Sequence, residues 1–501
     1  MTDLYNFQSD MNGDDLARAE ELMKAMEAGL GTGRDYNDTL HNGPGLKTES
    51  LDAVTKVLAQ RMEHLVFHQT MPKQRIYNTV HEYNQLFKYG EDIGIFNAEG
   101  ETPAFTDSQY RRKSATTKFT GVGGQVTHPA MLAKYADGKN ALQREVENKT
   151  ILLMTLLNQK VVNADSSKGE KEFDGVFSLH QKGLADIVGG AAGMSSETLL
   201  DTYFNDVAVK NADGEILSDG LVEGATQSIV NDRFGMADRI IAPPSVWSAY
   251  VTQFHESKRF IPGLSGAIIG ATTGQSVNDI QTQFGKLPIK SDIFFDYRRP
   301  KKYNAVTTSD KSPAKPVADV TTPIAVNTDA KTKFTNHAGT YFYAVTAKNR
   351  YGESAIEPIN TTGQAVTATQ SVDIKFAAGS GAYAAESFVV YRTEADVASY
   401  QTADYYPLFE VSVTELAAGW DAAAVTLVRD RNRFIAGTHS ALVYENSPEI
   451  IEYLEFGPTQ KMDLAITSPS RRFLVLNYGC PVLYQPGKIS RIVNIKGSKS
   501  L

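Results

Sequence analysis

One long helix restricts the fold of this sequence more than any other feature. Residues 139–163 place apolar side chains at three- and four-residue steps, the spacing of a single helix face. The stripe consists of Leu142, Val146, Leu153, Leu157 and Val161. The positions that widen it are Ile151, Leu152, Met154 and Leu156. At a rise of about 1.5 Å per residue, these 25 residues span roughly 37 Å. A helix that is long and apolar on most sides predicts a structural spine.

An all-strand segment interrupts the α+β pattern around this helix. Residues 170–300 alternate helical and strand-like stretches. Residues 300–320 carry three prolines among Lys, Ser and Thr, which is typical of a linker. Residues 320–432 then form many short strands separated by turn residues, the pattern of a β-sandwich. Because the mixed pattern returns from residue 433, we predict an α+β body with a sandwich inserted into it.

Individual elements of the body follow from local periodicity. Helices are predicted at 196–209, 219–234 and 245–254. Strands are predicted at 239–242, 287–295, 472–477, 482–484 and 489–495. These segments lie on both sides of the predicted insertion, so the body is expected to combine both.

The first 130 residues do not read as a compact domain. Amphipathic helices are predicted at 14–30 and 50–68, and we expect an arm that buries its apolar face on a neighbouring subunit. Strands are predicted at 76–80 and 118–122, with a long polar stretch between them. That stretch contains five aromatic residues, too many for typical disorder. We therefore expect an extended two-stranded loop that docks onto a partner.

The composition excludes several classes of protein. The formal net charge is −8, whereas dedicated nucleic-acid binders carry a basic excess. The single cysteine, Cys480, cannot form an internal disulfide, and its apolar neighbours predict a buried thiol. No apolar run approaches the roughly 20 residues of a membrane span, and the N-terminus lacks the pattern of a secretory signal. We therefore expect a protein that is made and used in a cytoplasm.

No catalytic, cofactor-binding or metal site is predicted, so we expect the protein not to be an enzyme. His64 and His68 are four residues apart on a predicted helix, but no third metal ligand lies nearby in the sequence. The GVGG sequence at 121–124 does not continue into a phosphate-binding pattern, and a strand bend is the better interpretation. Ser178 and His180 lack the surroundings of a nucleophile elbow.

Charged residues of the long loop are the candidate contact site. Arg111, Arg112 and Lys113 form a basic cluster, and Glu99 and Glu101 precede it in the same loop. These residues are either ordinary solvated charges or ion pairs that set the register with a neighbouring subunit. Surface ion pairs contribute only about 0–1 kcal/mol, so the sequence leaves both interpretations open.

The order of these segments resembles the Hong Kong 97 fold of tailed-bacteriophage major capsid proteins. Residues 87–132 are similar to the extended loop of that family and its return strand, and residues 142–167 to its spine helix. EKEFDGVFSLH at 170–180 resembles the strand after the spine helix. Residues 239–254 resemble the entry to the axial domain, and residues 474–496 the strands that close the peripheral domain.

The inserted segment resembles a fibronectin type III or immunoglobulin-like domain. The likeness rests on GTYFYAVTAKNRYGESA at 339–355 and on FVVYRTE at 388–394. Together the two resemblances imply five segments. They are an N-terminal helical arm (1–75), the extended loop with flanking strands (76–130), the spine helix with peripheral and axial domains (131–305), the inserted sandwich (306–432) and the closing strands of the capsid body (433–501).

The resemblance implies a subunit that self-assembles into pentamers and hexamers. These would form an icosahedral head shell around double-stranded DNA, without sequence-specific DNA binding and without a membrane. Portal, scaffolding or decoration proteins would be further partners. Assembly would occur in the cytoplasm of the host bacterium, and the protein would end in the virion capsid. The alternatives are an encapsulin-like compartment shell, a phage tail or adhesion protein, and an enzyme with a carbohydrate-binding sandwich module, which the lack of an acid/base or metal-binding pattern disfavours. The inserted sandwich disfavours the first alternative, and the long spine helix disfavours the second.

Overall fold

The computed structural model describes residues 65–90, 96–97, 99–100, 102–103, 105–133, 140–188, 194–257, 277–296, 299–319, 322–418, 427–466 and 468–498. The arm helices predicted at 14–30 and 50–68 lie outside these residues, apart from the end of the second. There the described chain begins with a short helix, α2 (Phe67–Thr70). Among the described residues, no helix has the length and apolar character needed to cross a membrane.

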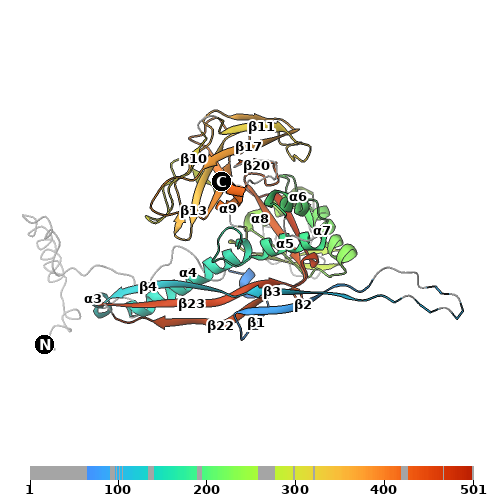
Figure 1. Cartoon of the computed structure of the whole chain (residues 1–501), viewed down its shortest axis with the longest axis horizontal. Helices are drawn as coiled ribbons and strands as arrows, with labels where there is room; N and C mark the ends of the chain where they lie inside the picture. The colour runs from blue at the N-terminus through green and yellow to red at the C-terminus, as the bar shows by residue number, and fades with distance from the viewer. Residues whose placement is uncertain are drawn as a thin grey trace, which may run out of the picture.

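The predicted spine is the helix α4 (Ala141–Asn163), which has 23 residues. It begins where the side chain of Asn140 accepts a hydrogen bond from the N–H of Leu142 at 3.1 Å, which satisfies one of the free donors of the first turn. Leu157 and Val161 of the predicted stripe are buried. This stripe packs on a long sheet, so that helix and sheet form two layers (Figure 1).

The long sheet has four strands. In spatial order they are β1 (Lys73–Arg75), β22 (Ile451–Asp463), β23 (Ser470–Leu483) and β4 (Lys118–Thr127). β1 pairs with β22 in parallel, and the other pairs are antiparallel. The strands predicted at 472–477 and 482–484 are one continuous strand, because β22 and β4 pair with β23 across the residues between them.

The GVGG sequence lies within β4, which runs unbroken through it. Gly124 stands opposite Phe473 of β23. A Cβ atom on Gly124 would lie 2.3 Å from Cζ of Phe473, closer than non-bonded atoms approach. Phe473 is buried in a small cluster with Leu153 of α4. The glycine therefore provides room for a ring between sheet and spine, and the strand does not end or turn there.

A second sheet of six strands lies beside the long one. In spatial order its strands are β5 (Val209–Asn211), β24 (Ile489–Lys496), β21 (Thr438–Tyr444), β6 (Arg239–Ala242), β8 (Gly285–Ser291) and β7 (Asp279–Thr282). The helices of this region are α5 (Val176–Val188), α6 (Ser196–Phe204), α7 (Asp219–Arg233) and α8 (Pro244–Ser257). β21 pairs with β6, and β24 pairs with β5. The sheet therefore joins chain segments from both sides of the predicted insertion.

The strand expected at 170–180 is wrong, since this segment runs into helix α5. Val176, His180 and Leu184 recur at four-residue steps, and all three are buried. This is the spacing of one helix face, and it extends beyond the short segment on which the strand prediction was based.

Two element ends also differ from the prediction. The helix expected at 196–209 ends at Phe204, and the chain then enters β5. The strand expected at 287–295 ends at Ser291. There the side chain of Asp292 accepts a hydrogen bond from the N–H of Phe294 at 2.8 Å, which turns the chain.

Residues 301–430 form sheets whose strands, within the described chain, pair only with one another (Figure 1). One sheet contains β14 (Gly352–Glu353), β13 (Tyr343–Asn349), β18 (Ser387–Arg392), β19 (Asp404–Ser412) and β9 (Lys301–Lys302), with β15 (Glu357–Pro358) also on β13. The other contains β10 (Val317–Ala318), β17 (Gln370–Ala377) and β11 (Ile324–Thr328), with β20 (Leu427–Asp430) also on β17. β12 (Gly339–Tyr341) and β16 (Gln364–Val366) form a ribbon, and the helix α9 (Val413–Ala418) follows β19.

Both sheets contribute to one core. Val345 and Val390 face it from one sheet, and Val372, Ile374 and Val428 from the other. β9 and β10 lie within 300–320, so the segment predicted as a linker supplies strands to both sheets. Pairing of distant residues explains this difference, since the partner of β9 is β19, about a hundred residues further along the chain.

The extended loop is a two-stranded hairpin. β2 (Val80–Lys88) and β3 (Gln109–Thr116) pair in antiparallel and project away from the body (Figure 1). After Thr117 the chain enters β4, which the short helix α3 (His128–Leu132) follows. Both strands reach further into the polar stretch than the sequence predicted.

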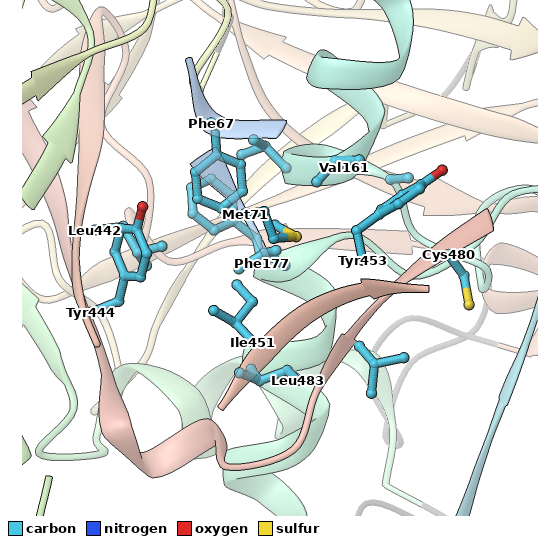
Figure 2. Packing of buried hydrophobic residues seen from close by; sticks show 14 of the residues in the cluster. Phe67, Met71, Val161, Phe177, Leu442, Tyr444, Ile451, Tyr453, Cys480 and Leu483 are labelled. Carbon is cyan, nitrogen blue, oxygen red and sulfur yellow. The ribbon is translucent and has the colours of Figure 1, made fainter. Parts of the chain in front are cut away.

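The largest buried cluster lies where α2, α4, α5 and the two sheets of the body meet (Figure 2). The ring of Phe67 lies edge-on to that of Tyr444, with centroids 5.9 Å apart, and Val161 and Phe177 belong to the same cluster. Cys480 is also a member, as the sequence predicted. Burial raises the pKa of its thiol to about 11, so the thiol stays protonated at neutral pH.

Candidate assembly surfaces

The root of the hairpin is attached to the body by polar and aromatic contacts. The ring of Tyr83 on β2 lies edge-on to that of Tyr484, with centroids 4.8 Å apart. The side-chain amide of Gln85 donates to the carbonyl oxygen of Tyr484. On β3, Nζ of Lys113 lies 2.7 Å from Oδ2 of Asp186 on α5. Contacts on both strands therefore fix the direction in which the hairpin leaves the body.

The predicted basic cluster lies on β3 and interacts with its own chain. A guanidinium N–H of Arg111 donates to the carbonyl oxygen of Asp186 at 3.1 Å. Arg112 forms an ion pair of 2.5 Å with Glu82 of β2, and both side chains are largely exposed. Such an exposed pair contributes only about 0–1 kcal/mol. These contacts do not test pairing with a neighbouring subunit, which stays a prediction.

The predicted acidic residues lie near the tip of the hairpin. Glu99 is exposed, whereas Glu101 lies outside the described residues. Phe96 and Phe105, which flank them, are 93% and 90% exposed. The described part of the tip therefore presents apolar rings and negative charge to its surroundings.

A groove of about 830 Å³ lies beside the root of the hairpin. β2 and β3, the end of α5, residues 448–452 and residues 484–488 form its walls. Within it Glu452 is 7% exposed and accepts a hydrogen bond from the hydroxyl of Tyr484 at 3.2 Å. Burial raises the pKa of Glu452 above its ordinary value.

The start of the described chain is held by a buried carboxylate that the sequence analysis missed. Asp292, fully buried after β8, accepts hydrogen bonds from the N–H groups of Val66 and Phe67 at 3.0 and 2.9 Å. It also accepts from the side-chain amide of Asn158 on α4 at 2.9 Å. Asn158 in turn accepts from the N–H of His68. The chain that emerges from residues 1–64 is thereby tied to the spine. No local pattern indicates this contact, because its partners lie 134 and 225 residues from Asp292.

An ionic junction, also missed, joins the all-β segment at 301–430 to helix α6. Arg431 and Arg433, just after β20, form ion pairs with Glu197 and Asp201 of α6. All four side chains are 4–14% exposed. Burial alone would lower the pKa of Arg433, but its hydrogen bond and charge interaction with Glu197 raise it. The signal was available in the sequence: two arginines at two-residue spacing after a strand, and two acids at four-residue spacing on a helix.

The described residues hold no group of three or more His, Cys, Asp and Glu side chains placed to bind a metal ion. His68 lies in the core, whereas His64 is outside the described residues. His180 is fully buried between the hydroxyl of Tyr203 and the carbonyl oxygen of Ile489, at 3.0 Å from each. Both ring nitrogens are therefore engaged in structural hydrogen bonds, and the hydroxyl of Ser178 donates to Asp174 at 3.1 Å.

The sequence relatives of this chain are phage major capsid proteins. It is 23% identical over 494 residues to the major capsid protein of Staphylococcus phage S25-3 and to that of Staphylococcus phage K. In both comparisons 95% of this chain and 95% of the relative are covered. No family model matches the sequence. The chain is therefore similar, along nearly its whole length, to proteins that carry this name.

Comparison with solved structures returns phage capsids and an encapsulin, each at low similarity. The capsid of cyanophage P-SCSP1u is 7% identical, with a TM-score of 0.43, and 93% of this chain and 98% of that chain are covered. For the capsid of phage XM1 the identity is 8%, the TM-score 0.39 and the coverage 89% and 97%. For the SrpI encapsulin of Synechococcus elongatus the identity is 6%, the TM-score 0.39 and the coverage 89% and 95%.

Proposed function

We propose that this protein is a major capsid protein that builds the head shell of a tailed phage. The similarity along 95% of the chain to major capsid proteins of Staphylococcus phages carries this proposal. It supports the head-shell function expected from the sequence. The encapsulin alternative is weaker, since the sequence relatives are phage proteins.

The build of the molecule suits a subunit whose role is mechanical. A spine helix packed along a four-stranded sheet resists bending, and the hairpin reaches beyond the body (Figure 1). The proposed architecture is the Hong Kong 97 fold, with the arm at 1–75, the extended loop at 76–130, peripheral and axial domains at 131–305 and closing strands at 433–501. The self-contained strand pairing of residues 301–430 supports an inserted fibronectin type III or immunoglobulin-like domain at 306–432.

The proposed partners follow from a closed shell. Identical chains would form pentamers and hexamers, since repeated heterologous contacts close into rings. The shell would enclose DNA without reading its sequence, which fits a net charge of −8. Portal, scaffolding or decoration proteins would bind to this shell, and assembly would take place in the host cytoplasm.

Electron microscopy of the full chain, purified and in phage particles, tests the function. The purified chain is expected to form rings, capsomers or closed shells. An antibody to it should label the heads of particles that carry its gene, and those heads should protect DNA from nuclease. Labelling confined to tails would contradict the proposal in favour of a tail protein. Shells of this chain without phage heads would favour a compartment protein.

The basic cluster on β3 is proposed to contact a neighbouring subunit. Replacing Arg111, Arg112 and Lys113 together by Ala is expected to impair shell assembly while the monomer still folds. The ion pairs that these residues form within the chain are partly exposed and contribute only about 0–1 kcal/mol each. Circular dichroism would check the fold and sedimentation the assembly. Normal shells from this variant would contradict the proposal.

A further inference from the structure

A cleft of about 500 Å³ lies between the body and the all-β segment at 301–430. The end of α4, the loop after it, α5 and α6 line it from the body. Lys348, residues 408–410 and Glu415 line it from the all-β segment. A cleft of this size can hold a small organic molecule. A molecule bound there would contact both parts of the chain.

Much of the buried lining of this cleft is apolar. Phe177 of α5, Leu200 of α6 and Leu408 of β19 line it and are at most 8% exposed. Phe409 and Phe434 also line the cleft and are partly buried. Side chains of this kind form the surface on which the apolar part of a ligand lies.

The lysines and acids of the cleft neutralise one another. They form the pairs Lys160–Glu172, Lys168–Glu415, Lys182–Asp165 and Lys348–Glu410. These side chains are 13–42% exposed, so they lie nearer to solvent than the apolar lining. The remaining cation of the cleft is Arg491 of β24.

Arg491 is a buried charge whose contacts are with neutral groups. It is 4% exposed, and its Cζ lies 3.5 Å from the centroid of the Phe177 ring. Nη2 donates to the hydroxyl of Ser440 at 3.0 Å, and Nε has no hydrogen-bond partner in the part of the chain that the structure describes. A buried charge is unfavourable unless an opposite charge is placed beside it. The cleft therefore contains one positive charge that an anion would neutralise.

We infer that this cleft binds a small organic carboxylate, with its charged group on Arg491 and its apolar part against Phe177 and Leu200. A guanidinium group presents its donors in a planar fork that matches a carboxylate. Because the walls belong to the body and to the all-β segment, the ligand would hold the two together beside the ion pairs of Arg431 and Arg433. The inference does not depend on the proposed function.

Binding of 4-phenylbutyrate to the full chain, measured by ligand-observed NMR, tests the inference. This probe has a carboxylate and a phenyl ring, and 4-phenylbutanamide has a similar shape without the charge. The parent is expected to bind the acid with a Kd of about 1 mM or lower, and the amide at least about tenfold more weakly. Equal binding of the two probes overturns the inference, and so does a lack of acid binding at about 10 mM.

Replacing Arg491 by Met removes the charge and keeps an unbranched side chain. Arg491→Met is expected to weaken binding of the acid at least about tenfold and to leave binding of the amide unchanged. Lys302→Met is the matched control, because it removes one positive charge at an exposed side chain of β9. This control is expected to bind both probes as the parent does. Acid binding by Arg491→Met that equals the control's overturns the inference.

A second variant tests the cleft if Arg491→Met does not fold. Leu199→Trp places a larger, half-buried side chain of α6 in the cleft and leaves Arg491 in place. It is expected to weaken binding of the acid at least about tenfold, since the ring fills the space of the ligand. The acid should also raise the Tm of the parent and not that of this variant, because a ligand stabilises the folded state that it binds. Acid binding that Leu199→Trp leaves unchanged would place the probe elsewhere and overturn the inference.

Discussion

At the scale of single residues, the packing of Gly124 against Phe473 can be tested directly. Gly124 on β4 lies across from the ring of Phe473. A Cβ atom added to Gly124 would lie only 2.3 Å from Cζ of that ring. Gly124→Ala is therefore expected to lower the free energy of unfolding by about 1–3 kcal/mol, the usual cost of overpacking. Gly123→Ala is the matched control, because its Cβ would meet Leu474 at an ordinary 3.5 Å. Urea unfolding compares the two, and equal losses would contradict the packing argument.

His68 gives the protein a sensitivity to acid. Burial, with a further contribution from Lys73, lowers the pKa of His68 to about 4 from its ordinary 6.5. As the pH falls below 6.5, the unfolded chain takes up a proton that the folded chain does not. The free energy of unfolding is therefore expected to fall as the pH is lowered from 6.5 towards 4. His180, with a pKa lowered to about 3 by burial, acts in the same direction.

Replacing His68 by Phe tests this titration. The variant keeps an aromatic ring, which in His68 lies edge-on to Tyr453, and it removes a buried Nε2 that has no hydrogen-bond partner among the described residues. Relative to the parent, it is expected to gain roughly 2 kcal/mol more at pH 5 than at pH 8. Chemical unfolding at the two pH values measures the difference. A gain that does not depend on pH would exclude titration of His68 as the cause.

At the scale of elements, the junction between α6 and the all-β segment at 301–430 is held by buried ion pairs. Removing Glu197 leaves the buried Arg431 and Arg433 without one of their carboxylate partners. Glu197→Ala is therefore expected to destabilise the protein by about 3 kcal/mol. Glu82→Ala removes an exposed partner of Arg112 and is expected to cost less than about 1 kcal/mol. Urea unfolding measures both, and similar losses would show that the junction contributes little.

Sequence periodicity predicted the elements whose apolar residues lie close together along the chain. α4, α7 and α8 were found near their observed bounds because each buries one local face, and β6 because its short apolar run is buried on both faces. Elements that depend on distant partners were not. β23 is continuous only because β22 and β4 pair with it, and β9 is a strand only because β19 lies beside it.

Some residues of the candidate contact site could likewise be predicted from a local pattern, and others could not. The sequence indicated Arg111, Arg112 and Lys113, because a basic cluster in a loop is a local feature. It did not indicate Asp186, which lies 73 residues from Lys113 and reaches it through the packing of α5. The groove likewise combines residues of β1, β2, β3, α5 and α7 with residues 448–452 and 484–488, and only the fold brings them together.

At the scale of the whole molecule, the proposed contact of Arg111, Arg112 and Lys113 with a neighbouring subunit predicts that assembly depends on salt. Raising the ionic strength from about 0.1 M to 1 M shortens the screening length from roughly 10 to 3 Å. The assembled fraction is expected to fall at least about fivefold, as charge steering and pairing weaken. Light scattering during assembly measures this. Assembly that strengthens with salt would show that apolar contacts dominate instead.

The similarity to phage major capsid proteins bears out the function that was expected from the sequence. The order of segments carried that expectation. Assembly depends on surfaces that identical chains share, and a single sequence does not show which of its surfaces meet.

The attachment of the all-β segment at 301–430 has a practical consequence. Its strands pair only with one another in the described chain, while buried ion pairs at Arg431 and Arg433 hold it to α6. Its loop at 380–384 is exposed. A peptide grafted into this loop would therefore keep a fixed orientation relative to α6. A shell of such chains would then present the graft as a lattice with regular spacing and one orientation, which is the arrangement that multivalent receptors and antibodies bind most tightly.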